Sequence, residues 1–371
     1  MTDTSAAPTA PAAPAAPTRP AAPTGPAAPA RPVAAGFGAG APASGDDGHL
    51  RILSASDLAG IDIPLADVVD TVEGAYRALH TGRSDSPVKP AAGPDGGHPV
   101  SYAVLGRDGS RDVVAVTSSY AHGPGAGPAA RHPYTALTLY DDVTGRPVAM
   151  MDGARVGALS APAVSALLAR ECAAPGARTA LVVGTGAQGR LTLPFLLTTL
   201  PGLDRLMVFG TDPEGVAAVR SELRARFPDR DVTAVNDLRA AAADADVIVA
   251  TADARTPAAV ESTWLRTGAL TVLAGHGLAP STLDRADRVI ATSEAQMAAT
   301  GADMADADGK LRAVDSEFAA VIAGLTAGRH HPKERIFAYN SGLVVTDIAL
   351  GHHFAQLALR RNLGTEVALW L

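Results

Sequence analysis

Between residues 176 and 315, short apolar runs alternate with stretches in which apolar residues recur at helical spacing. The runs predict strands at 180–183, 205–209, 231–235, 246–251, 269–274 and 288–291. The pattern between them predicts helices, the clearest at 191–200 and 213–227. Because strands that alternate with helices are typical of a doubly wound parallel sheet, we expect an α/β domain over 176–315.

The pattern on either side of this segment is different. Apolar positions at helical spacing predict a helix over 65–79, and shorter β-type runs predict strands at 101–105, 112–116, 134–140 and 147–151. Further helices are expected at 160–173, 315–325 and 346–359. We therefore expect a second, β-rich unit over residues 49–175, with a hairpin at 134–151, and expect residues 316–371 to return and pack on it.

The first 48 residues consist mostly of Ala, Pro, Thr and Gly. Prolines recur every third position from Pro8 to Pro32, which matches the three-residue turn of a polyproline II rod. Since this segment lacks large aliphatic side chains, it cannot form a core, and we expect a disordered tail. Two uses remain open, a solvated tether and a docking arm for a partner protein.

Three glycines stand between the first predicted strand of the parallel sheet and the helix after it. They form a Gly-x-Gly-x-x-Gly motif at Gly184, Gly186 and Gly189. In such a strand–turn–helix context, the first glycine permits a tight turn, the second lets a pyrophosphate approach, and the third lets helix and strand pack closely. The start of the helix, with Ala187 and Gln188, then offers free N–H groups to the phosphates. The motif predicts a Rossmann domain that binds a nicotinamide dinucleotide.

The end of the second strand bears on the choice between NAD and NADP. Gly210 stands where NAD enzymes often place an acidic residue, which leaves room for a 2′-phosphate that Thr211 would hydrogen-bond. Asp212 would repel that phosphate, although it also suits the N-cap of the next helix. The balance favours NADP slightly, and NAD remains open.

Composition excludes several other classes. The 371 residues are 47% hydrophobic, carry a net charge of −7 and show no basic cluster, so neither nucleic acid nor a membrane surface is an expected partner. With one cysteine, the chain can form no internal disulfide and no cysteine metal cluster, and no metal site is expected. No apolar run is long enough to span a membrane, and no signal sequence is evident, so a cytoplasmic protein is expected.

Three residues are candidates for catalysis. His276 lies between two glycines after the fifth strand, on the side of the sheet where α/β proteins bind ligands, and histidine can donate a proton near neutral pH. Tyr120 and His122 follow a strand of the other domain and could face the same cleft. Each of the three also has a purely structural interpretation as a loop residue.

Several landmarks occur together in order along the chain. They are Asp141-x-x-Thr-Gly-x-Pro-x-Ala149, Ala163-Val-Ser-Ala166, Gly184-Thr-Gly-Ala-Gln188, Val249-Ala-Thr-Ala252, Asn340-Ser-Gly342 and Asp347-Ile-Ala349. In this order the chain, from about residue 50 onward, resembles the ornithine cyclodeaminase/mu-crystallin family. The resemblance implies a Rossmann domain beside an antiparallel-sheet domain for substrate binding and dimerisation, with a small-molecule substrate in the cleft. It also places Thr251, Ala252 and Ser341 near the nicotinamide.

The chemistry that the resemblance implies is hydride transfer between a nicotinamide and an amino-bearing carbon. Three positions depart from the pattern of members that handle amino acids. Ser160 and Ala161 stand where an Arg-Thr pair is usual, Val114 where a lysine is usual, and Gly277 where a catalytic aspartate is usual. Since an arginine fork binds a carboxylate bidentately, its loss predicts a substrate without a free α-carboxylate.

The leading hypothesis is therefore an NAD(P)H-dependent imine reductase or amine dehydrogenase. A specialised biosynthetic route is one place where such an enzyme would act. A cyclodeaminase that recycles its NAD internally is a close variant. A non-catalytic cofactor-binding protein of the crystallin type is an alternative from another class, because loss of three family residues also fits loss of catalysis.

Overall fold

The computed structural model describes residues 48–92, 101–120, 134–253, 256 and 259–370, without the side chains of Ala91, Ala92, Ser101 and Tyr120. The predictions for the proline-rich segment before residue 48 and for His122 lie outside the described residues. The described residues all belong to one compact unit, Ala34–Leu371.

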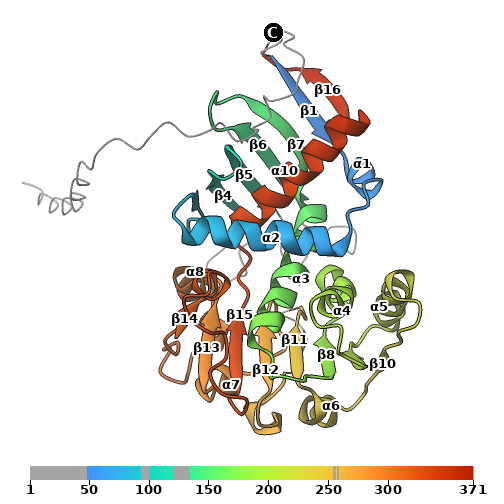
Figure 1. Ribbon diagram of the computed structural model, residues 1–371, viewed down its shortest axis with the longest axis vertical. Coiled ribbons are helices and arrows are strands. Elements are labelled where there is room, and N and C mark those ends of the chain that lie inside the picture. The colour runs from blue at the N-terminus through green and yellow to red at the C-terminus, as the bar shows by residue number, and fades with distance from the viewer. Residues whose placement is uncertain (1–47, 93–100, 121–133, 254–255, 257–258, 371) are drawn as a thin grey trace, which may run out of the picture. The chain divides into compact units, whose positions relative to one another are not determined.

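One sheet is built from the first and last described segments of the chain. In spatial order its strands are β16 (Thr365–Ala368), β1 (His49–Leu53), β7 (Pro147–Asp152), β6 (Tyr134–Asp141), β5 (Val113–Tyr120), β4 (Ser101–Asp108) and β2 (Ser84–Asp85), with β3 (Ala91–Ala92) also paired to β4. All neighbours run antiparallel except β1 and β7. The expected antiparallel sheet is therefore present, and β16 forms one edge of it, beside β1 (Figure 1).

Helices α2 (Leu65–His80) and α10 (Val344–Arg361) lie side by side, and α10 packs on β4, β5 and β6 (Figure 1). Two glycines permit this close packing. A Cβ on Gly106 would lie 2.3 Å from Val344 Cγ1, and one on Gly351 would lie 2.4 Å from Leu137 Cδ2. A short helix, α1 (Ala55–Ala59), follows β1.

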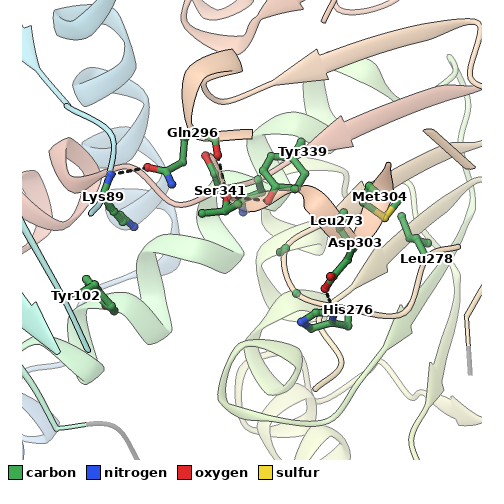
Figure 2. A pocket seen from close by; sticks show the side chains of 15 residues that line it. Lys89, Tyr102, Leu273, His276, Leu278, Gln296, Asp303, Met304, Tyr339 and Ser341 are labelled. Atoms are coloured by element: carbon green, nitrogen blue, oxygen red, sulfur yellow. Dashed lines mark hydrogen bonds and ion pairs between the residues drawn. The ribbon is translucent and has the colours of Figure 1, made fainter. Parts of the chain in front are cut away.

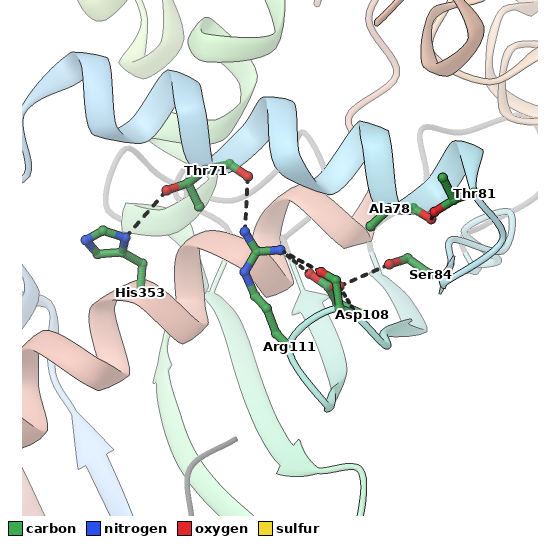
Figure 3. A network of polar contacts seen from close by, with 8 residues as sticks. Thr71, Ala78, Thr81, Ser84, Asp108, Arg111 and His353 are labelled. Atoms are coloured by element: carbon green, nitrogen blue, oxygen red, sulfur yellow. Dashed lines mark hydrogen bonds and ion pairs between the residues drawn. The ribbon is translucent and has the colours of Figure 1, made fainter. Parts of the chain in front are cut away.

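A buried carboxylate fastens the edge of this sheet to α2 (Figure 3). Asp108 is fully buried, accepts a hydrogen bond from Ser84 Oγ at 3.0 Å and pairs with Arg111 at 2.5 Å. Arg111 also donates to the Thr71 carbonyl of α2 at 3.5 Å. Burial alone would raise the pKa of the Asp108 carboxyl, but the Arg111 charge and hydrogen bonds from Ser110 and Arg111 hold that pKa below its usual value.

The second sheet is wholly parallel. Its strands, in spatial order, are β10 (Thr233–Ala234), β9 (Arg205–Phe209), β8 (Thr179–Val183), β11 (Val247–Ala250), β12 (Leu270–Leu273), β15 (Ile336–Tyr339), β13 (Arg288–Ala291) and β14 (Ser316–Glu317). The segments between them include α4 (Ala187–Thr199), α5 (Pro213–Arg226), α6 (Leu238–Asp244), α7 (Pro280–Asp284), α8 (Glu294–Thr300), α9 (Phe318–Ile322), η2 (Ser262–Trp264) and η3 (Ala302–Met304). The predicted fold class, a doubly wound parallel sheet plus an α+β unit, is confirmed.

Helix α3 (Gly153–Cys172) connects the two sheets (Figure 1) and packs against α2, α4 and β12. It begins earlier than the predicted residue 160, because Asp152 acts as its N-cap and accepts a hydrogen bond from the Ala154 N–H at 3.0 Å. The early start makes Ser160 a residue of the helix interior.

The parallel sheet continues beyond residue 315, where the sequence placed its end. Both β14 and β15 belong to it, and β15 lies between β12 and β13. Its four residues are all buried, and such a short apolar run cannot be told from a buried helix segment by periodicity alone. The chain therefore leaves the parallel sheet at Asn340 and passes through Ser341 and Gly342 into α10.

Candidate functional site

The glycine-rich turn joins β8 to α4. Gly184 has a φ of +112°, and a Cβ on it would lie 2.7 Å from the backbone of Thr251 and Ala252. A Cβ on Gly189 would lie 2.2 Å from the Gly184 carbonyl oxygen. Around Gly186, by contrast, a Cβ would meet nothing within 4 Å. The fold of the turn thus requires Gly184 and Gly189, while Gly186 leaves its outer surface open.

This open surface fits a diphosphate. Gly186 is the N-cap of α4 and provides no side-chain cap, so the first N–H groups of α4, at Ala187 and Gln188, remain for a ligand. Behind the turn, the Thr251 N–H donates to the Val183 carbonyl at 2.8 Å, which holds β11 against the turn. The residues present therefore suit a dinucleotide, whose phosphates would lie against the positive end of the helix dipole.

The end of β9 carries the residues that bear on cofactor choice. Thr211 and Asp212 are exposed. The Asp212 carboxylate caps α5 and accepts hydrogen bonds from the N–H groups of Glu214 and Gly215, both at 3.1 Å. Gly210 lies against Thr185, because a Cβ on it would come within 2.5 Å of Thr185 Cγ2. The structural interpretation of Asp212 as an N-cap is confirmed.

A cavity of about 310 Å³ opens at the carboxyl ends of β12 and β15 (Figure 2). His276, from the loop after β12, and Asp303, from η3, line one end. Gln296, Tyr339 and Ser341 line the middle. Lys89 and Tyr102, which belong to the antiparallel-sheet part of the chain, line the other end. The cavity thus lies between the two sheets, as ligand sites of α/β proteins do.

His276 is held beside the glycine-rich turn by its backbone. It exchanges two hydrogen bonds with Ala252, N–H to carbonyl in each direction, both at 2.9 Å. Its Nδ1 atom lies 3.6 Å from Asp303 Oδ2, and the imidazole is 39% exposed. His276 therefore places its imidazole at the cavity, beside the glycine-rich turn.

At the opposite end, the backbone N–H of Lys89 donates to the buried Gln296 side chain at 2.8 Å, which links the two parts of the chain. Ser341 is fixed by Thr292, with 2.7 Å between the two hydroxyl oxygens. Burial lowers the pKa of the Lys89 ammonium, although the nearby Asp347 carboxylate opposes that shift. Burial also raises the pKa of Asp347, which Lys89 and a hydrogen bond from Ser160 partly offset.

Sequence analysis did not single out Lys89, and it treated Asp347 only as a position matching the family. Lys89 lies between prolines in a segment without hydrophobic periodicity, so no pattern placed it. One signal was available. The chain has 31 lysines and arginines together, yet its only lysines are Lys89, Lys310 and Lys333. Because Lys310 and Lys333 are exposed, this rarity was a weak signal for Lys89.

Of the three predicted catalytic residues, the structure describes the side chain of His276 only. His276 lines the cavity, whereas His122 lies outside the described residues. Tyr120 ends β5, where it pairs with Ser101 and Tyr134, and its side chain is not described. Their convergence on one point therefore stays a prediction.

The three departures from the family pattern have different structural settings. Ser160 is buried and donates a hydrogen bond to Asp347 Oδ1 at 2.8 Å. Gly277 has a φ of +116°, and a Cβ there would lie 3.0 Å from Val183 Cγ1, so an aspartate would be strained at this position. Val114 pairs with Arg107 and Tyr140 and does not line the cavity.

Two further observations concern the described part of the chain only. None of its helices has both the length and the apolar character needed to cross a bilayer. Within the same residues, His, Cys, Asp and Glu side chains form no group of three or more that could hold a metal ion.

Comparison with known proteins extends these findings. The Nodulation efficiency protein NfeD of Rhizobium meliloti is 26% identical over 336 residues, which cover 86% of this chain and 98% of that protein. A Delta(1)-pyrroline-2-carboxylate reductase of Bacillus cereus is 24% identical over 241 residues, or 62% of this chain and 73% of the reductase. An archaeal alanine dehydrogenase, solved as a dimer with bound NAD, shares the fold with a TM-score of 0.70 and 19% identity, over 86% of this chain and 99% of that one.

The family model "Ornithine cyclodeaminase/mu-crystallin family" matches residues 52–356. This range contains the glycine-rich turn, Lys89, His276 and Asp347, and the resemblance found in the sequence is confirmed. The chain belongs to the ornithine cyclodeaminase/mu-crystallin family.

Proposed function

We propose that this protein is an NAD(P)-dependent oxidoreductase that acts on a carbon–nitrogen bond, reducing an imine or oxidising an amine. The observation that carries the proposal is the position of the cavity. It lies at the carboxyl ends of β12 and β15 and reaches His276, whose backbone is bonded to Ala252 behind the glycine-rich turn. The family's reductase and dehydrogenase members support the same reaction class.

The cofactor would be held by residues of four segments. They are Gly184, Gly186, Ala187, Gln188 and Gly189 at the phosphates, Thr211 and Asp212 at the ribose, Thr251 and Ala252 behind the turn, and Ser341 at the amide end. When bound there, a nicotinamide supplies or accepts the hydride. The protein would orient the nicotinamide and the substrate toward each other.

His276 would serve as the proton donor to the nitrogen in the reductive direction. It lines the cavity and lies 3.6 Å from a carboxylate of Asp303 that can orient its ring. Titratable groups, rather than apolar packing, also form the other end of the cavity, at Lys89 and Tyr102. This composition favours an enzyme over a cofactor-binding protein without turnover.

The substrate in this proposal has no free α-carboxylate. Among the described residues, no arginine lines the cavity, and Lys89 is the one strong cation that does. The Asp347 carboxylate near Lys89, which is partly exposed, offsets part of its charge. A substrate carboxylate would therefore find no cation fork, which supports an imine or amine whose carboxylate is absent or masked.

Two opposed features govern the choice between NAD and NADP. The exposed hydroxyl of Thr211 and the absence of an acidic side chain at Gly210 support the slight preference for NADP expected from the sequence. The Asp212 carboxylate opposes it, because it would repel the phosphate. Direct titration with both reduced coenzymes decides between them.

We also propose a homodimer through the sheet that contains β1, β6 and β7. A cavity of about 730 Å³ on this sheet is lined mainly by apolar atoms, and Ile52, Tyr134 and Met150 beside it are exposed. An apolar patch of this kind is typical of a surface that a second copy covers. Sedimentation of the full chain tests this, and a monomer at micromolar concentration would contradict it.

The experiment that tests the function combines binding with turnover. NADH and NADPH are titrated first, and NAD(P)H oxidation is then followed with cyclic imines offered with and without a carboxylate. We expect binding of at least one coenzyme and faster turnover of imines without a carboxylate. Fast turnover of free ornithine, lysine or proline would overturn the substrate proposal. Ammonia release from a diamino acid without net coenzyme change would identify a cyclodeaminase, and binding without any turnover would identify a crystallin-type protein.

A further inference from the structure

A second pocket lies apart from the cleft, where α2, α10 and the turn between β4 and β5 meet (Figure 3). Its polar lining residues are Thr71 of α2, Arg111 of the turn, and His352, His353, Gln356 and Arg360 of α10. None of them lines the cavity at β12 and β15. The pocket has a volume of about 230 Å³, which is below the roughly 300–1,000 Å³ typical of drug-sized ligands, so it suits a small ligand.

The polar groups that line this pocket are mostly cations and hydrogen-bond donors. They comprise two arginines, two histidines, a glutamine and a threonine, with no Asp or Glu among the described lining residues. The buried Asp108 carboxylate does not line the pocket, and it is taken up by Arg111, Ser84 and Ser110. Because a guanidinium offers paired N–H groups to an oxyanion and repels a metal ion, this set of groups favours an anionic ligand.

Both arginines keep donors for a ligand. Arg111 directs its Nη1 to Asp108 and Ser110 and its Nη2 to the Thr71 carbonyl, so its Nε–H makes no hydrogen bond within the described residues. Arg360 is exposed in the last turn of α10 and forms neither a hydrogen bond nor an ion pair with the described part of the chain. Both guanidinium groups can therefore donate to an anion in the pocket.

Two histidines complete the pocket. The His353 Nδ1 atom lies 3.5 Å from the Thr71 hydroxyl oxygen of α2 (Figure 3), and the His352 Nε2 atom lies 3.5 Å from Gln356 Nε2. A neutral imidazole carries one N–H group and an imidazolium carries two, so each ring gains a donor when it is protonated. The histidines therefore add both charge and donors to the pocket in their protonated form.

The charges around the two rings keep them neutral near pH 7. Burial, and then the Arg111 charge, lower the pKa of His352 to about 4, with His353 adding to the shift and Asp108 opposing it. Burial also lowers the pKa of His353, where Asp67 opposes the shift and the two arginines of the pocket add to it. A bound anion would oppose the effect of the arginines and raise both pKa values.

We propose that this pocket binds the phosphate group of inorganic phosphate or of a small phosphate ester, through Arg111 and Arg360. A phosphate has three acceptor oxygens and close to two negative charges, which match several donors better than a carboxylate does. Because Arg111 also donates to α2 and Arg360 belongs to α10, the ligand would fasten the two helices together. The pocket and the cleft share no lining residue, so the proposal is independent of the proposed reaction.

The experiment titrates the full chain by calorimetry with sulfate, a phosphate analogue that keeps both its charges near neutral pH. Runs with and without saturating NADH or NADPH separate this pocket from the glycine-rich turn, which is the other expected oxyanion site. We expect a Kd on the order of 1 mM near pH 7.5, unchanged by coenzyme, and about threefold tighter binding near pH 5.5, because binding takes up protons. Inorganic phosphate and glycerol phosphate, compared near pH 7.5, show whether free phosphate suffices or an ester binds more tightly.

Matched variants test the residues named. Arg360→Gln removes one guanidinium without breaking an ion pair of the described residues and should weaken sulfate binding about tenfold. Arg361→Gln removes the same charge from the next residue, which is also exposed but does not line the pocket, and should leave the affinity within about twofold. His352→Gln should reduce the dependence of the affinity on pH. The thermal midpoint without sulfate shows whether each variant is folded.

Three results would overturn the proposal. Equal losses in Arg360→Gln and Arg361→Gln would show attraction to the net charge of the helix end rather than binding in the pocket. Displacement of sulfate by coenzyme, with no effect of Arg360→Gln, would place the anion at the glycine-rich turn. A lack of binding by sulfate, phosphate and the ester alike would exclude the site altogether. Loss in Arg360→Gln alone, with coenzyme bound throughout, would establish it.

Discussion

The two ends of the cleft are built in different ways. The glycine-rich turn consists of backbone from residues 184–189, and its fitness for a ligand comes from a missing side chain at Gly186 and from the start of α4. The other end consists of side chains from distant segments, with Lys89 in a loop and Tyr102 on β4. A backbone site tolerates sequence change outside its glycines, whereas a side-chain site can change its charge, and hence its substrate, through single substitutions.

The largest effect is expected at the backbone end. Gly186→Val fills the open surface of the turn, where a Cβ now meets nothing within 4 Å, so the fold should persist while the diphosphate is excluded. We expect coenzyme affinity to fall by more than about 100-fold, since close approach to these N–H groups is lost. Fluorescence titration of NADH and NADPH measures it. Gly202→Val, in the turn before β9, is the matched control and should bind normally.

The proton-donor role can be tested without disturbing the turn. His276→Gln should lower kcat for imine reduction by about 100-fold, which is typical for loss of a general acid, with coenzyme affinity unchanged. Stopped-flow measurement of a single turnover separates the chemical step from binding. His80→Gln, at an exposed helix end, serves as the control. Unchanged kcat in His276→Gln would assign the proton to another group of the cavity.

The contribution of Asp108 to the stability of the antiparallel-sheet part should depend on pH. The pKa of Asp108 is held below its usual value of 3.8, so its contribution to stability is complete above about pH 4 and is lost as pH falls through the lowered pKa. Asp108→Asn should therefore reduce the free energy of unfolding at pH 7 by about 2 kcal/mol.

Urea denaturation of this variant and of wild type, at pH 7 and at pH 3, measures the effect. The difference between the two proteins should shrink at the lower pH. Asp204→Asn, which breaks an exposed pair with Arg178, should cost less than about 0.5 kcal/mol. A pH-independent difference for Asp108→Asn would show that packing, rather than charge, accounts for the loss.

The smallest effect is expected at the rim of the coenzyme site. Asp212→Asn keeps a side chain able to cap α5 but removes the negative charge near Thr211. The ratio of NADPH to NADH affinity should rise about threefold, the scale of an exposed charge interaction. Parallel titrations measure the ratio, and a shift toward NADH would mean that Asp212 does not face the 2′ position.

Much of the fold could be predicted from patterns of residues that are close together in the sequence. The apolar runs and the glycines at 184, 186 and 189 identified the parallel sheet and its ligand edge, because a strand–turn–helix motif is local in sequence. The short strand β15 was missed, and with it the point where the chain leaves this sheet. Four buried residues carry no periodicity, and only pairing with β12 and β13 makes them a strand.

The sequence alone determined that the chain has a nucleotide-type turn, a second sheet and a family resemblance, since each depends on residues that are close along the chain. Tertiary structure alone decided which polar groups from distant segments form hydrogen bonds with one another. Ser160 and Asp347 are 187 positions apart and share a hydrogen bond. Lys89 and Gln296, likewise distant in sequence, join across the cleft. No local pattern encodes such contacts, because they arise only when the packing of α3 and α10 brings the two parts of the chain together.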